Sequence, residues 1–176
     1  MTRSNNKIKL LTLTGVFAAL IFVVTMIHIP TGNGFTHAGD GVIYLSACLL
    51  PAPYAVAASA IGGALADGIS GFPIWIPGTV VIKALTALFF TNKTYKTVNL
   101  RNILGILPSL LVCVIGYSFY EAVFILGQLS WSTVTAAFTQ LPSYAVQICS
   151  SAVLYIAVGT FIDKTGLKKR LLTMGQ

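Results

Sequence analysis

Residues 8–29 read IKLLTLTGVFAALIFVVTMIHI, an apolar run with one lysine near its start. A helix rises about 1.5 Å per residue, so a run of this length crosses the roughly 30 Å hydrocarbon core of a bilayer. The whole chain has a mean hydropathy of +0.85 and only 9% charged residues, against about 25% in soluble domains. The sequence therefore predicts an integral membrane protein, with residues 1–176 forming a single transmembrane domain.

Five further apolar runs follow the first one and complete a predicted all-α bundle of six membrane helices. Their ranges are 41–50, 54–68, 74–90, 103–126 and 143–162. The second run is too short to cross a bilayer unaided, so it must tilt, borrow flanking residues or be re-entrant. The Gly-rich stretch 30–40 is expected to be a loop, and 127–142 is either a loop or a helix at the membrane interface.

The basic residues give the orientation of this bundle. They fall before the first run, between the fourth and fifth, and after the sixth, and these three groups hold ten of the eleven Lys and Arg residues: Arg3, Lys7, Lys9, Lys93, Lys96, Arg101, Lys164, Lys168, Lys169 and Arg170. With six spans all three groups lie on one side, and basic residues favour the cytoplasm. Both termini are therefore predicted to be cytoplasmic, and the basic groups are explained by topology rather than by nucleic-acid binding.

Charged side chains at membrane depth are the first candidates for function, because each is costly there. The sequence has Asp40, Asp67, Lys83 and Glu121 at such positions, with His28 as a further possibility. In a six-span topology all except Lys83 lie toward the outer ends of their helices. Nearby aromatic side chains could stack on a heteroaromatic ring: Phe35, Tyr44, Phe72, Trp75, Trp131 and Tyr144.

Structural roles compete with ligand binding at several of these positions. Lys83 could form an internal ion pair with Asp67, and Asp40, which follows Gly39, could cap a helix N-terminus. Trp75 and Trp131 could anchor the chain at the membrane interface. Gln147 could offer its amide to a ligand or to a neighbouring helix.

Sequence motifs of catalysis are missing from the chain. It has no phosphate-binding G-x-x-x-x-G-K-[ST] loop, no H-E-x-x-H zinc motif and no G-x-S-x-G elbow, so it is not expected to be an enzyme or to hydrolyse ATP by that route. Cys48, Cys113 and Cys149 lack metal-ligand spacing. Neither a metal nor a cofactor is expected.

Small residues recur at helical spacing in the first run, where Thr14 pairs with Ala18 and Gly15 with Ala19. Small side chains let helices approach closely in lipid. This pattern serves either packing within the bundle or docking to another membrane subunit.

Four segments, in order and spacing, resemble the substrate-binding S components of energy-coupling factor (ECF) transporters. They are HAGDGVIY at 37–44, LLPAPY at 49–54, GGALAD at 62–67 and TVVIK at 79–83. The similarity is to the branch with riboflavin, pyridoxine and hydroxymethylpyrimidine proteins, and the six-run pattern extends it over the chain.

The resemblance implies a protein of the bacterial cell membrane that captures a vitamin or precursor from outside for ATP-driven import. A hydroxymethylpyrimidine- or pyridoxine-like heterocycle is favoured, although a carboxylated ligand such as pantothenate could use Lys83. ATP would be used only by partners, namely two ATPase subunits joined through a transmembrane coupling subunit that docks on Thr14, Gly15, Ala18 and Ala19. The residues expected to bind substrate are Phe35, His37, Asp40, Tyr44, Asp67, Trp75, Lys83, Glu121, Trp131, Tyr144 and Gln147.

Two other functions compete with nutrient capture. A ligand-free assembly subunit of a membrane complex would use only the small-residue faces, and a stand-alone secondary transporter would work without ATPases. The sequence shows neither the inverted repeats nor the paired broken helices that secondary transporters carry, which argues against the second alternative.

Overall fold

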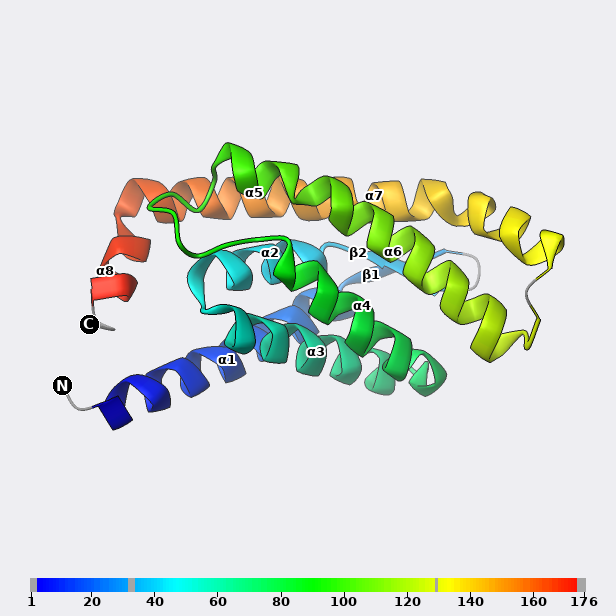
Figure 1. The fold of residues 1–176 in the computed structure, drawn as a ribbon, viewed down its shortest axis with the longest axis horizontal. Helices are drawn as coiled ribbons and strands as arrows, with labels where there is room; N and C mark the ends of the chain where they lie inside the picture. The colour runs from blue at the N-terminus through cyan, green and yellow to red at the C-terminus, as the bar shows by residue number, and fades with distance from the viewer. Residues whose placement is uncertain (1–2, 32–33, 129, 174–176) are drawn as a thin grey trace.

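The computed structural model describes residues 3–31, 34–128 and 130–173, which are mainly helical (Figure 1). The elements in chain order are α1 (Arg3–Met26), β1 (His28–Thr31), β2 (Gly34–His37), α2 (Gly39–Leu49), α3 (Ala52–Ile69), η1 (Pro73–Trp75), α4 (Ile76–Leu88), α5 (Leu100–Leu104), α6 (Ile106–Tyr120), η2 (Glu121–Ile125), α7 (Trp131–Thr165) and α8 (Leu167–Thr173).

Three helical segments within the described ranges are long and apolar enough to cross a membrane. They are Asn5–Met26, Leu100–Ile125 and Leu141–Thr165, and shorter apolar helices cover Gly39–Leu49 and Pro73–Leu88. Many of their large apolar side chains are exposed, such as Ile115 at 64% and Val153 at 68%. An apolar surface of this kind suits contact with lipid, so the expectation of an all-α membrane protein is confirmed at that level.

Two segments differ from the expected loops. Residues 28–31 and 34–37 pair as two antiparallel strands, in which His28 pairs with His37 and Thr31 with Gly34. Each strand is only four residues long, and the strands contain Pro30 and Gly34, residue types that are depleted in strands, so the sequence gives no strand pattern here. Helix α7 begins at Trp131 and runs through Pro142 without ending, so 131–142 is neither a loop nor a separate helix.

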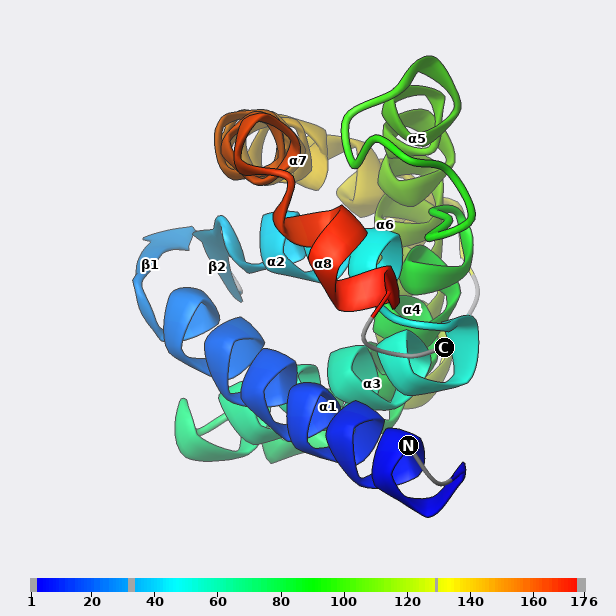
Figure 2. The same cartoon turned by 90° about the vertical axis from the view of Figure 1, so that its left-hand side faces the viewer.

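Helix α2 lies in the middle of the molecule, with α1, α3, α4 and α7 around it (Figures 1 and 2). Its residues from Gly39 to Cys48 are all buried. The Tyr44 ring stacks on Phe90 with centroids 4.4 Å apart, and both rings contact Tyr155 edge-on at 6.0 and 5.9 Å. This short helix is therefore the core of the bundle, which explains why a segment too short to span a membrane is still mostly apolar.

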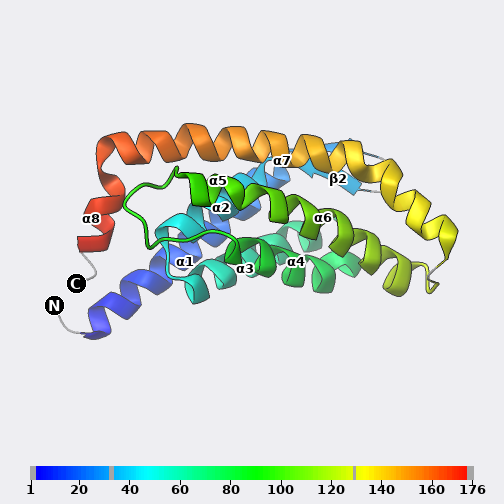
Figure 3. The same cartoon turned by 45° about the horizontal axis from the view of Figure 1, so that its top comes forward.

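The connection between α4 and α5 is fastened to the end of α7 by polar contacts. The Asp163 carboxylate accepts the backbone N–H groups of Thr97 and Val98 at 2.6 and 2.9 Å, and the Tyr155 hydroxyl donates to the Thr97 carbonyl at 2.7 Å. The same end of the molecule holds the first turn of α1 and helix α8 (Figure 3). The opposite end carries the hairpin, the α3–α4 turn and the start of α7.

Close approach of α1 to α3 depends on Gly62. A Cβ atom there would lie 2.7 Å from both the Ala18 carbonyl oxygen and the Ile21 Cβ, whereas a Cβ at Gly15 would meet nothing within 4 Å. In lipid, such contacts between backbones supply much of the packing energy of a bundle.

We expect Gly62→Ala to destabilise the protein by about 1–3 kcal/mol, because overpacking forces the two helices apart. Gly15→Ala is the matched control and should be neutral or stabilising by up to about 1 kcal/mol, the gain in helix propensity. Thermal unfolding in detergent measures both variants. Equal melting temperatures for the two would contradict the tight α1–α3 contact.

Candidate functional site

A buried ion pair between Asp40 and Lys83 forms the polar centre of the bundle. The Lys83 ammonium lies 2.6 Å from Asp40 Oδ1, and the Gln147 amide donates to Asp40 Oδ2 at 2.8 Å. The exposed fractions are 0% for Asp40, 3% for Lys83 and 4% for Gln147. The three side chains come from α2, α4 and α7, so one carboxylate links three helices.

These contacts correct two sequence-based alternatives. The ion-pair partner of Lys83 is Asp40, not Asp67. Asp40 is not an N-cap: the cap position of α2 is Ala38, and Asp40 lies in the first helical turn. Its carboxylate is directed across the bundle because Lys83 and Gln147 offer stronger donors than the backbone of its own helix.

Glycines on two helices allow this centre to form. A Cβ at Gly41 would lie 2.5 Å from the Ser151 carbonyl oxygen on α7, and one at Gly63 would lie 2.9 Å from Thr79 Cγ2 and 3.2 Å from Lys83 Cγ. Larger side chains at either position would hold α7 or α4 away from the Asp40 carboxylate. Gly41 and Gly63 therefore serve the site as well as packing.

Aromatic side chains from three helices gather beside the ion pair. The Lys83 ammonium lies 5.5 Å from the centroid of the Tyr117 ring, and Tyr117 stacks on Tyr144 with centroids 6.0 Å apart and planes 5° apart. Trp75 contacts Tyr117 at 5.9 Å and Tyr120 at 5.8 Å. The cluster presents ring faces and edges on which a flat ligand could stack, and its cation–π contact helps to place Lys83.

A second polar group is formed by Asp67 of α3 and Thr79 of α4, and Thr79 lies one helical turn from Lys83 along α4. Asp67 is 7% exposed and Thr79 is 2% exposed, and the Thr79 hydroxyl lies 3.2 Å from the Tyr117 hydroxyl. Thr79 also faces the Asp67 carboxyl. The predicted site residue His37 is buried at the end of the hairpin, where its Nδ1 accepts the Gly39 backbone N–H at 3.0 Å.

The contacts described above do not include four of the predicted site residues, namely Tyr44, Trp131, Glu121 and Phe35. Tyr44 is fully buried in the core, where its hydroxyl is 2.9 Å from Ser109 Oγ, and Trp131 is 81% exposed at the start of α7. Glu121 opens the π-helical turn η2 at the end of α6. The side chain of Phe35 lies outside the described residues.

Three residues of the cluster were missed by sequence reasoning: Tyr117, Tyr120 and Thr79. Tyr117 and Tyr120 stand in an apolar run together with Phe119, and Thr79 is an ordinary hydroxyl in a membrane helix. The only signal was spacing, since Tyr117 and Tyr120 are three residues apart and share a helical face.

The four predicted docking residues divide between two environments. Thr14 and Ala18 are 7% and 4% exposed, and the Ala18 carbonyl lies opposite Gly62 on α3. Gly15 and Ala19 are exposed. Packing inside the chain therefore explains the first pair, and only the second pair offers a surface to another subunit.

An apolar groove of about 740 Å³ lies between α4 and α6, lined within Pro77–Leu85 and Leu111–Phe124. Its walls are hydrocarbon apart from Tyr120, so it lacks the convergent polar groups of a site for a polar ligand. Within the described ranges, no group of three or more His, Cys, Asp or Glu side chains is placed to hold a metal ion.

Comparison with known families gives one match that covers most of the chain. The family model described as "ECF-type riboflavin transporter, S component" matches residues 5–164. No curated protein matches the sequence.

We expect Lys83→Met to destabilise the protein by about 3–5 kcal/mol, because it leaves the Asp40 carboxylate buried without its cation. The double variant Asp40→Asn, Lys83→Met should regain part of this loss, since both charges are removed together. Lys93→Met, in the exposed α4–α5 connection, is the control. Unfolding in detergent reports the effect, and a Lys83→Met protein as stable as wild type would rule out the ion pair as a structural centre.

Proposed function

We propose a function from the premise that this chain belongs to the family of ECF-type riboflavin transporter S components. Members of such a family are substrate-binding subunits of vitamin transporters in the membrane, not enzymes. The proposal is that this chain captures a small vitamin-like heterocycle outside a bacterial cell, for import driven by ATPase subunits of a partner complex. The observation that carries it is the aromatic cluster of Trp75, Tyr117, Tyr120 and Tyr144 beside the buried polar groups.

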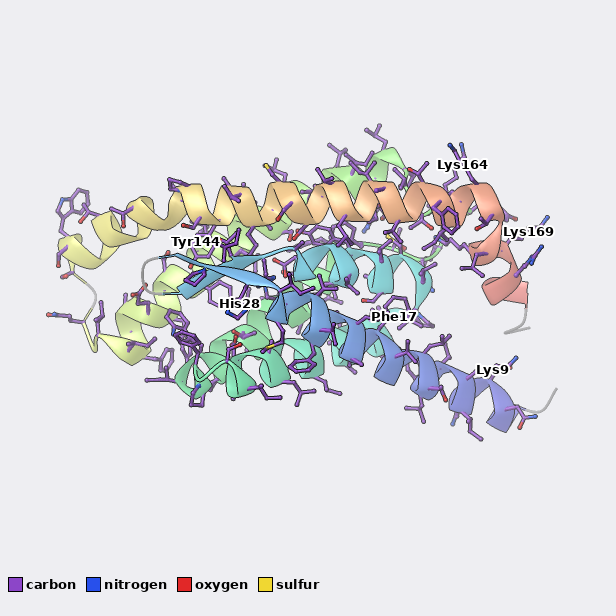
Figure 4. The ribbon with its side chains drawn as sticks, turned by 180° about the vertical axis from the view of Figure 1, so that it is seen from behind. Lys9, Phe17, His28, Tyr144, Lys164 and Lys169 are labelled. Atoms are coloured by element: carbon purple, nitrogen blue, oxygen red, sulfur yellow. The ribbon has the colours of Figure 1, made fainter. Side chains whose placement is uncertain are left out.

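The proposed topology has six membrane helices with both termini in the cytoplasm. In Figure 4, Lys9, Lys164 and Lys169 lie at one end of the molecule, and His28 and Tyr144 lie in the other half. This separation supports an outward-facing ligand site, because basic residues favour the cytoplasmic side. The Asp40–Lys83 pair then lies on the cytoplasmic side of the site.

A single-ring nitrogen heterocycle of the pyridoxine or hydroxymethylpyrimidine type is the proposed ligand. Ring stacking on Tyr117 or Tyr144 and a small number of nearby polar groups would fix the position of such a ring. Riboflavin is the second candidate, because the matched family takes its name from it. Its three-ring system offers more area for stacking, but the rings of the aromatic cluster would have to move further apart to admit it.

The proposed partners are a transmembrane coupling subunit and two ATPases. The surface proposed for docking is the part of α1 around Gly15 and Ala19, where small exposed side chains allow close approach of another helix. Figure 2 shows α1 at the edge of the bundle, packed on α3 and open on its other side. No ATP-binding motif of the chain itself is needed in this division of labour.

A bound ligand should raise the thermal stability of the purified protein. Ligand at 100 times its dissociation constant stabilises by about 2.7 kcal/mol. We expect pyridoxine or hydroxymethylpyrimidine to raise the melting temperature in detergent, with riboflavin tested beside them and ATP as a negative control. If none of the three vitamins shifts the melting temperature, the assembly-subunit function is favoured instead.

Docking can be separated from ligand binding by substitution on α1. We expect Ala19→Leu to abolish co-purification with the coupling subunit and ATPases, because the larger side chain blocks close approach, and to leave the ligand-induced thermal shift unchanged. Ala157→Leu, at an exposed position of α7, is the matched control. Undiminished co-purification of the Ala19→Leu protein would exclude this face.

A further inference from the structure

The carboxyl group of Asp67 has an oxygen without a partner in the described part of the chain. Its Oδ2 atom is buried and makes no hydrogen bond, and the residue as a whole is only 7% exposed. A buried acceptor left unpaired costs about 1–3 kcal/mol. Hydroxyls of Thr86, Thr97, Ser118 and Ser151 are also buried without a partner in the described ranges, but Asp67 is the one acidic side chain among these groups. A buried unpaired acid calls for an explanation, because buried polar groups are paired in the great majority of cases.

The position of Asp67 places it at the aromatic cluster. Gly63 and Asp67 are four residues apart on α3, and Thr79 and Lys83 are four residues apart on α4, so each pair shares a helical face. Gly63 lies against Thr79 and Lys83. Asp67 is one turn further along α3, where Thr79 faces its carboxyl and the Thr79 hydroxyl reaches the Tyr117 hydroxyl at 3.2 Å.

The ammonium group of Lys83 is paired with Asp40 and not with Asp67. The Lys83 ammonium contacts Asp40 Oδ1 at 2.6 Å and lies 5.5 Å from the centroid of the Tyr117 ring. Asp40 in turn accepts from Lys83 and Gln147. The inner polar group is therefore satisfied within the chain, whereas the outer group at Asp67 is not.

We propose that Asp67 is the ligand-recognising acid of the site, and that it accepts a hydrogen bond from an N–H or O–H donor on the edge of a neutral or cationic heteroaromatic ligand stacked on the Tyr117 cluster. Asp40 and Lys83 hold the fold and do not contact the ligand in this arrangement. The ligand class then excludes anions, because a carboxylate ligand would meet Asp67 without a free cation to pair with. This inference rests on the proposed function and narrows its substrate class.

The experiment compares Asp67→Asn with wild type, using pyridoxine, hydroxymethylpyrimidine and riboflavin as donor-bearing probes and pantothenate as the anionic probe. Affinities are measured by calorimetry in detergent after small molecules have been washed from the immobilised protein. Ser70→Ala, at the C-cap position just after α3, is the matched control, since its hydroxyl contacts only Met26 Sδ in the described hydrogen bonds. We expect the wild type to bind at least one donor-bearing probe and not pantothenate.

Asp67→Asn should weaken that binding at least tenfold, because a charge-assisted hydrogen bond is about twice as strong as a neutral one. Binding within twofold of wild type, or preferential binding of pantothenate by wild type, overturns the proposal. The Ser70→Ala protein should bind as wild type does.

The melting temperature of the ligand-free proteins gives a second readout that needs no ligand. A buried carboxylate that lacks a partner lowers the stability of the ligand-free protein. The Asp67→Asn protein should therefore melt at the same temperature as wild type or at a higher one. A clearly lower melting temperature would assign Asp67 to the fold and overturn the inference. If no donor-bearing probe binds wild type, the proposed function fails, and this second readout still decides the role of Asp67.

Discussion

The ion pair between Asp40 and Lys83 is the constraint on which the rest of the bundle depends. Two charges with exposed fractions of 0% and 3% are tolerated only because they lie 2.6 Å apart and because Gln147 supplies a further hydrogen bond. The requirement fixes α2, α4 and α7 against one another. It also explains why α2 is short and enclosed: its first turn must reach the middle of the molecule, where the carboxylate meets its partners.

From this centre the molecule divides into two halves with different chemistry. On one side, Tyr44, Phe90 and Tyr155 form an aromatic core, and Asp163 fastens the α4–α5 connection to α7. This half is closed by contacts within the chain. On the other side, the rings of Trp75, Tyr117 and Tyr144 lie beside a carboxyl oxygen that lacks a partner. Aromatic rings beside an unpaired carboxyl oxygen suit a subunit that binds a ligand on that side of the molecule.

Sequence patterns predicted the membrane character and the buried charges, because hydropathy and the cost of a charge in lipid leave strong local signals. They could not show which acid pairs with Lys83, because Asp40, Asp67 and Lys83 lie on three different helices. Only the packing of α2 against α4 brings Asp40 to Lys83. The paired strands at 28–31 and 34–37 were missed because they are four residues each. Tyr117 was missed since one aromatic residue in an apolar run is indistinguishable from a lipid-facing one until the helix rotation is known.

The proposed function requires the protein to hold a small vitamin-like molecule beside the aromatic cluster. The most direct measurement is to purify the protein in detergent from cells grown in rich medium, denature it, and identify the released small molecules by mass spectrometry. We expect one compound in near-equal amount to the protein, a heteroaromatic ring with an N–H or O–H donor and no carboxylate. Protein that releases no such compound, and stays empty when the growth medium is supplemented with pyridoxine, hydroxymethylpyrimidine and riboflavin, would contradict it.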